Sequence, residues 1–94
     1  MITEYITEGA TDKYHLQLRA TEIIATRNSP IKLLFGEVIE GKDVARIDLL
    51  IQNGDKIEMQ IQGLKQGIAL IHVYIHFMDS TIETVCIHHR GVNC

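Results

Sequence analysis

Apolar and polar residues alternate one by one along most of residues 31–89, and this period of two constrains the fold more than any other feature of the chain. Successive side chains of a β-strand point to opposite faces of a sheet, whereas an amphipathic helix places its apolar residues three and four positions apart. The alternation therefore predicts strands with one buried face. The apolar residues of that face occupy the odd positions Ile31, Leu33, Phe35, Ile39, Ala45, Ile47, Leu49, Ile51, Ile57, Met59, Ile61, Ala69, Ile71, Val73, Ile75, Phe77, Val85 and Ile87.

Turn sequences divide this stretch into five predicted strands. The segments EGKD, QNG and GLKQG, and the region of MDST, are rich in glycine and small polar residues, which favour turns. Short connections of this kind join neighbouring antiparallel strands. We therefore predict a mainly β domain in which an antiparallel meander forms a small barrel or sandwich. Its strands are expected at about 31–39, 44–51, 55–62, 68–77 and 82–89.

The segment DVARIDLLIQNG also fits a helix, which would begin after Asp43 as the N-cap and end before Gly54. We prefer the strand and keep the helix over residues 43–54 as an alternative. A two-residue Asn53-Gly54 turn would divide the apolar residues between two faces of the hairpin, so we expect a three-residue loop with glycine in the left-handed conformation. The register predicted from this loop pairs Ala45 with Ile61, Ile47 with Met59, and Leu49 with Ile57.

Residues 11–28 give a weaker pattern. Tyr14, Leu16, Leu18 and Ala20 alternate with polar residues, which favours a strand at 13–20 that could pair with ITEYIT before it. Residues 21–28 favour neither helix nor strand, because their apolar side chains do not gather on one side of a helix. An α+β fold with one helix within residues 11–28 is therefore the alternative fold class.

Size and composition indicate one domain, residues 1–94. The 94 residues suffice for a single apolar core, and 46% of them are hydrophobic, which excludes a disordered tail. No apolar run approaches the roughly 20 residues of a membrane-spanning helix, so no membrane association is expected. The net charge of −3 argues against nucleic acid as a partner.

The N-terminal residues and the cysteines bear on the cellular compartment. The start MITEYITEGATDK has neither the basic residues nor the apolar segment of a secretory signal. Cys86 and Cys94 do not form a disulfide framework. We therefore expect a cytoplasmic protein.

One segment resembles a known family. LLIQNGDKIEMQIQG is similar to the first two strands of Sm-like RNA-binding proteins, in which an Asn-Gly turn is followed five residues later by a glycine that lets the strand bend. Met59 occupies that position here, and the signature that follows in the family is missing. We assign no family to the chain.

Residues 70–89 hold four of the five histidines. With Met78 opposite Ile82, the predicted register places Tyr74 against Cys86 and His72 against His88. Such a face could bind a ligand through His72, Tyr74, His76 and His88. A metal could be held by His72 and His88 across the strands, but His72 and His76 lie about 13 Å apart along one strand and cannot share one. No metal, cofactor or catalytic residue is assigned.

Two further candidates arise from the predicted strands. Asp48 and Glu58 would face each other across the hairpin, and paired carboxylates can serve acid–base chemistry, although such residues usually extend into solvent. Cys86 lies in the middle of an apolar strand, which favours a packed, inert thiol over a nucleophile.

These observations favour binding over catalysis. We expect a small non-catalytic interaction protein that self-associates through residues 68–77, most simply as a dimer, because this long strand has no proline and no charge to protect an edge. Histidines in that interface would couple assembly to pH. The second hypothesis is a barrel that binds a small molecule or nucleotide on the His/Tyr face, and the third is a metal-assisted hydrolase on the same face.

Overall fold

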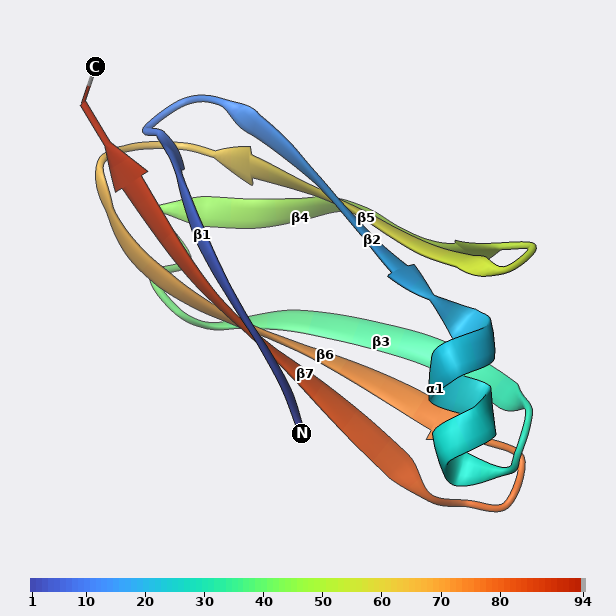
Figure 1. Ribbon diagram of the computed structural model, residues 1–94. Helices are drawn as coiled ribbons and strands as arrows, with labels where there is room; N and C mark the ends of the chain where they lie inside the picture. The colour runs from blue at the N-terminus through green and yellow to red at the C-terminus, as the bar shows by residue number, and fades with distance from the viewer. Residues whose placement is uncertain (94) are drawn as a thin grey trace.

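The computed structural model describes residues 1–93 and shows two β-sheets packed as a sandwich (Figure 1). The prediction of a mainly β fold is confirmed, and the sandwich, rather than the barrel, is its form. A short helix lies at one end of the two sheets (Figure 1). In chain order the elements are β1 (Ile2–Gly9), β2 (Lys13–Arg19), α1 (Ala20–Arg27), β3 (Ile31–Glu40), β4 (Ala45–Asn53), β5 (Lys56–Gly63), β6 (Gly67–Phe77) and β7 (Ile82–Val92).

The strands predicted from the alternation are present as β3 to β7, with bounds that differ from the predicted ones by at most three residues. The alternative helix over residues 43–54 is wrong, because β4 occupies this segment. In β5, β6 and β7 every second side chain is buried between the sheets, as the period of two requires. The core of the sandwich is formed mainly by Ile57, Met59, Ile61, Ala69, Ile71, Val73, Ile75, Phe77, Val85 and Ile87.

The strand order is β1-β7-β6-β3 in one sheet and β2-β5-β4 in the other. The predicted hairpins β4–β5 and β6–β7 are present, but the continuous meander is wrong. Residues 41–44 and 64–66 instead carry the chain between the sheets, whose apolar faces cover one another. At the first crossing Gly41 has a φ of +77°, and a Cβ there would collide with the backbone carbonyl of Ile68. Only glycine fits this position.

The two N-terminal strands join different sheets and do not pair with each other, contrary to the sequence-based expectation. β1 lies parallel to β7, with Ile2 opposite Val85, whereas β2 lies antiparallel to β5. This arrangement lets each strand extend an existing sheet and bury its own apolar residue, Ile6 from β1 and Leu16 from β2.

The register predicted for β4 and β5 is also wrong, and none of its three cross-strand pairs is formed. Asn53 lies opposite Lys56, so the hairpin has a two-residue loop. The register then shifts between Ile47 and Leu49, where a bulge adds one residue to β4. Between the loop and the bulge Leu50, rather than Leu49, packs against the core. The bulge therefore lets a two-residue loop coexist with apolar side chains buried along both halves of β4.

Helix α1 lies in the segment whose pattern favours neither helix nor strand, and contacts to the strands hold it. Its N-cap residue, Arg19, makes no side-chain cap. Instead the carboxylate of Asp55, in the β4–β5 turn, accepts hydrogen bonds from the hydroxyl and the backbone N–H of Thr21, and these bonds lower the pKa of Asp55. Arg27, in the last turn, pairs with Glu83 of β7. Among residues 1–93 there is no helix long and apolar enough to cross a bilayer.

Candidate functional site

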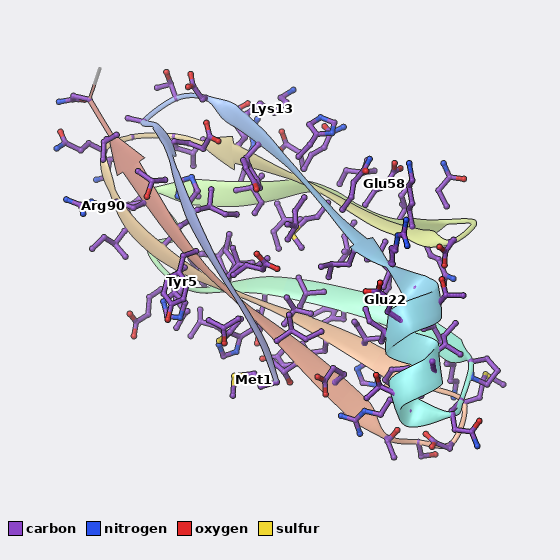
Figure 2. All side chains as sticks on the ribbon, in the orientation of Figure 1. Met1, Tyr5, Lys13, Glu22, Glu58 and Arg90 are labelled. Carbon is purple, nitrogen blue, oxygen red and sulfur yellow. The ribbon has the colours of Figure 1, made fainter. Side chains whose placement is uncertain are left out.

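The two sheets differ in the side chains that they turn toward solvent. The three-stranded sheet presents mostly charged and amide side chains, and Figure 2 shows those of Lys13 and Glu58 pointing away from the sandwich. The four-stranded sheet presents aromatic, aliphatic and imidazole groups, including Tyr5, which is 78% exposed, and Ile68, which is 69% exposed. We call this surface the outer face. It consists of Thr3, Tyr5, Thr7, Leu33, Phe35, Glu37, Ile68, Leu70, His72, Tyr74, His76, Ile82, Thr84, Cys86, His88 and Arg90.

All four residues predicted to bind a ligand, His72, Tyr74, His76 and His88, lie on the outer face. Strand alternation places them there, because their odd-numbered neighbours in β6 and β7 are buried. Their role in binding a ligand stays a prediction.

Four side chains from three strands form a chain of hydrogen bonds across the outer face, which we call the His72 cluster. The Sγ atom of Cys86 in β7 lies 3.1 Å from Nε2 of His72 in β6. The other ring nitrogen of His72, Nδ1, lies 3.3 Å from the hydroxyl oxygen of Tyr74. That hydroxyl donates a hydrogen bond of 2.9 Å to the carboxylate of Glu37 in β3. The bond to Glu37 is the main reason that the pKa of Tyr74 is raised, so the hydroxyl keeps its proton.

The register predicted for β6 and β7 is wrong by two residues, which keeps each side chain on its face but changes its partner. His72 lies opposite Cys86, and His88 lies opposite Leu70, so His72 and His88 do not form a cross-strand pair. His88 stacks instead on Tyr5 of β1, with the ring centroids 4.8 Å apart. His76 lies between Leu33 and Ile82, away from the cluster.

The corrected register also changes the metal hypothesis. The pair of ligand atoms within reach of one another is His72 Nε2 and Cys86 Sγ, rather than two imidazoles. Within residues 1–93 no group of three histidine, cysteine, aspartate or glutamate side chains is arranged to hold a metal ion. Two such ligands from one chain leave a tetrahedral site half filled.

The predicted pair of carboxylates, Asp48 and Glu58, is not formed. Asp48 lies at the bulge of β4 and accepts a 2.7 Å hydrogen bond from Nε of Arg46. Glu58 accepts a 3.2 Å hydrogen bond from the side-chain amide of Gln17 on β2. Each carboxylate therefore has a separate partner, and the hairpin offers no acid–base pair.

His89 is a titratable residue that the sequence analysis does not single out, and it lies in the core. Its side chain is 1% exposed, and neither ring nitrogen has a hydrogen-bond partner. Burial lowers the pKa of His89, an effect that the carboxylate of Glu8 partly opposes, so the ring is held neutral. The alternation offered a signal for this position, because residue 89 continues the buried series of Val85 and Ile87.

A further charged group lies where α1 meets β7. The carboxylate of Glu83 pairs with the guanidinium of Arg27 and lies 3.3 Å from the N-terminal ammonium of Met1. These contacts, above all the bond from Arg27, lower the pKa of Glu83. Arg27 also lies over the ring of Phe77, 5.6 Å from its centroid. The group fastens the helix and the N-terminus to the four-stranded sheet.

Comparison with known proteins supports the fold. The chain is similar to the solution structure of the PKD domain from KIAA 1837 protein, with a TM-score of 0.59 over 99% of this chain and 82% of that chain. The two sequences are 11% identical, so the likeness concerns the β-sandwich alone. No protein-family model matches the chain, and no curated protein matches it in sequence.

Proposed function

We propose that the protein is a small non-catalytic interaction module that self-associates, as a twofold dimer, through the outer face of its four-stranded sheet. The observation that carries this proposal is the contrast between the two sheets: one turns mostly polar side chains outward, with Ile51 exposed among them, and the other exposes Tyr5, Leu33, Phe35, Ile68 and Ile82. Contiguous apolar patches on monomeric proteins commonly mark an interaction site.

The size of the outer face suits a dimer. Four strands about 4.8 Å apart and about ten residues long cover a plan area of roughly 650 Å². Projecting side chains make the accessible area larger than this, which brings it near the roughly 800 Å² that each partner buries in a standard interface. A second copy that covers the sheet would therefore bury enough surface for a specific complex.

The charge of the outer face favours a second copy over a charged partner. Apart from Arg90, at the end of β7 and opposite Ile68, the central strands β6 and β7 turn neutral or imidazole side chains outward. The carboxylate of Glu37 is bonded to Tyr74 within the same chain. A face of this kind can pack on a copy of itself without bringing like charges together, whereas a strongly basic or acidic ligand would find little to bind.

We also propose a cytoplasmic location. The free thiol of Cys86 supports a reducing compartment, since thiols persist where glutathione and thioredoxin keep them reduced.

The test is the oligomeric state in solution. We expect size-exclusion chromatography with light scattering to give a dimer at micromolar concentration and pH 8. Phe35→Lys and Ile68→Lys should each shift the protein to a monomer, because a charge would then be buried in the interface. Gln17→Lys, on the exposed surface of β2, is the matched control and should leave the dimer intact.

The pH dependence of dimerisation provides an independent test of the same interface. The outer face carries three half-buried histidines, and imidazoles that gain charge in acid would place like charges between the two copies. Dimerisation should therefore weaken between pH 8 and pH 5.5. A monomer at micromolar concentration and pH 8 refutes self-association, and a dimer that persists in both lysine variants places the interface elsewhere.

A second candidate function is the binding of a small aromatic molecule beside His88. A hollow of about 330 Å³ on the outer face is lined by Tyr5, Ile68, His88 and Arg90, among others. The stacked rings of Tyr5 and His88 form one wall to which a flat ligand could add. Mass spectrometry under native conditions distinguishes the two candidates, because it reports a dimer, a carried ligand and a bound metal as different masses.

A further inference from the structure

We propose that Cys86 is a nucleophilic thiol, activated by His72, that exchanges with low-molecular-weight disulfides. The His72 cluster carries this inference. Because Cys86 lies on the outer face, the exchange belongs to the monomer, and a second copy packed on that face would protect the thiol. In this role His72 is the base, while Tyr74 and Glu37 position it. The proposal reverses the sequence-based expectation of a packed, inert Cys86.

The hydrogen bonds of the cluster have one consistent direction. The ionised carboxylate of Glu37 can only accept, so the Tyr74 hydroxyl donates its single proton to it. The Tyr74 oxygen is then free to accept from the N–H at Nδ1 of His72, 3.3 Å away. A neutral imidazole that carries its proton on Nδ1 has its lone pair on Nε2. The cluster therefore turns the basic nitrogen of His72 toward Cys86.

The thiol lies where that lone pair can take its proton. Sγ of Cys86 is 3.1 Å from Nε2 of His72, within the reach that a nucleophile and its base require. A base oriented by a further hydrogen-bonded group is the arrangement that activates cysteine and serine nucleophiles in unrelated folds. Three adjacent strands hold these atoms, so the backbone pairing of the sheet fixes their separation.

Cys86 lies on the outer face rather than in the core, which allows a small reagent to approach it. The residue is half-buried on the outer face, where its neighbour in β1 is the short side chain of Thr3. Access of this kind suits a small neutral disulfide better than a bulky or charged one.

The proposed exchange conserves atoms and electrons. The proton of the Cys86 thiol passes to Nε2 of His72, and the resulting thiolate attacks one sulfur of the disulfide. A bond between that sulfur and Sγ forms as the S–S bond of the reagent breaks, and the departing thiolate takes the proton from His72. The products are a mixed disulfide at Cys86 and one free small thiol, with no net oxidation.

The experiment measures the rate of this exchange with bis(2-hydroxyethyl) disulfide at pH 7, followed by intact mass. The parent and all variants carry Cys94→Ser, so that only Cys86 is modified, and Ile68→Lys, so that self-association does not cover the outer face. We expect His72→Ala to slow the modification at least about tenfold. This is less than the roughly hundredfold minimum typical of a positioned base, because a few per cent of a free thiol is already ionised at pH 7. Tyr74→Phe, which keeps the ring and removes the hydroxyl, should slow it a few-fold, while His15→Ala, on the exposed surface of β2, should leave the rate unchanged.

Added imidazole separates a base from a structural residue. In His72→Ala the missing side chain leaves room beside Cys86, and millimolar imidazole should restore much of the lost rate, while it leaves the parent and His15→Ala unaffected. Equal rates in the parent and His72→Ala would overturn the proposal. The proposal would also be overturned by two results found together: imidazole does not restore the exchange rate of His72→Ala, and Tyr74→Phe exchanges as fast as the parent.

Discussion

The buried imidazole of His89 allows a direct test of how the core is built. Its two ring nitrogens are shielded from water and lack partners, and the strand neighbours of the residue are Ala69 and Ile6. A buried polar atom without a hydrogen bond destabilises the folded state, because it loses its bonds to water and gains none in the protein. Replacement of His89 by leucine, an apolar side chain of similar size, should therefore stabilise the protein.

The size of the effect follows from the two unsatisfied nitrogens. Each such atom costs about 1–3 kcal/mol, and an imperfect fit of the new side chain offsets part of the gain. We expect His89→Leu to raise the free energy of unfolding at pH 8 by about 2 kcal/mol. For a domain of this length that corresponds to an increase of roughly 10 °C in Tm.

The pH dependence gives the prediction its second part. Burial lowers the pKa of His89 below its ordinary value of 6.5, so the unfolded chain takes up a proton more readily than the folded one. The stability of the parent is therefore retained above about pH 6.5 and falls as the pH decreases toward the lowered pKa. This one residue contributes a loss of at most about 1.4 kcal/mol per pH unit. His89→Leu lacks the titrating group and should lose less stability over this range.

The assay is urea denaturation followed by far-ultraviolet circular dichroism at pH 8, 7, 6 and 5. The gain in stability of His89→Leu over the parent should grow as the pH falls from 7 to 5. His15→Leu serves as the control, because this histidine is exposed on β2 and its replacement should change the stability little at every pH. A His89→Leu variant less stable than the parent at pH 8, or a gain that stays constant from pH 8 to pH 5, would refute the reasoning.

Two further predictions concern the Arg27 contact and the crossing between sheets. Glu83→Gln should lower the free energy of unfolding at pH 7 by about 1–2 kcal/mol. The pKa of Glu83 is lower in the folded state than its value of about 4.5 in the unfolded chain. This deficit should therefore be constant above about pH 4.5 and disappear as the pH falls through the pKa of the folded state, which acid denaturation measures. Gly54→Ala should cost about 1 kcal/mol in urea denaturation, because its φ of +60° disfavours a side chain but the space is open. Gly41→Ala should cost at least about 3 kcal/mol, since its Cβ also meets the backbone of Ile68, and equal costs would contradict the collision.

Local periodicity predicted the strands but not how they are paired. The alternation of β5, β6 and β7 reflects burial on one face, which acts on each strand separately and can be read from its own residues. The register predicted for β4 and β5 failed at the loop itself, which has two residues rather than three, and the bulge at Asp48, which gives no local signal, then shifts the register by one residue. The parallel pairing of β1 with β7 joins the two ends of the described chain, and no window of neighbouring residues contains both partners.

The candidate site was predictable to the same degree. The alternation of side chains along each strand placed His72, Tyr74 and Cys86 on one face. That placement remains correct although the predicted register was wrong by two residues. The partners were not predictable, because Glu37 and Tyr5 come from β3 and β1, whose positions beside β6 and β7 depend on the topology of the whole sandwich. The sequence of helix α1 did not predict a helix for a related reason. The helix is stabilised by contacts with Asp55 and Glu83, which lie far from it along the chain.

The place of β7 between β1 and β6 has a consequence for the order of events during synthesis. Of the described strands β1 is made first and its backbone partner β7 is made last, so β1 must wait until nearly all of the described chain has been made. Until then β6 has an unpaired edge on the side where β7 will add, and the apolar residues of both remain accessible to other chains. The late, long-range closure of β1 on β7 should make folding slow for a chain of this size. A nascent chain halted before Ile82 would lack the strand that joins its beginning to its body.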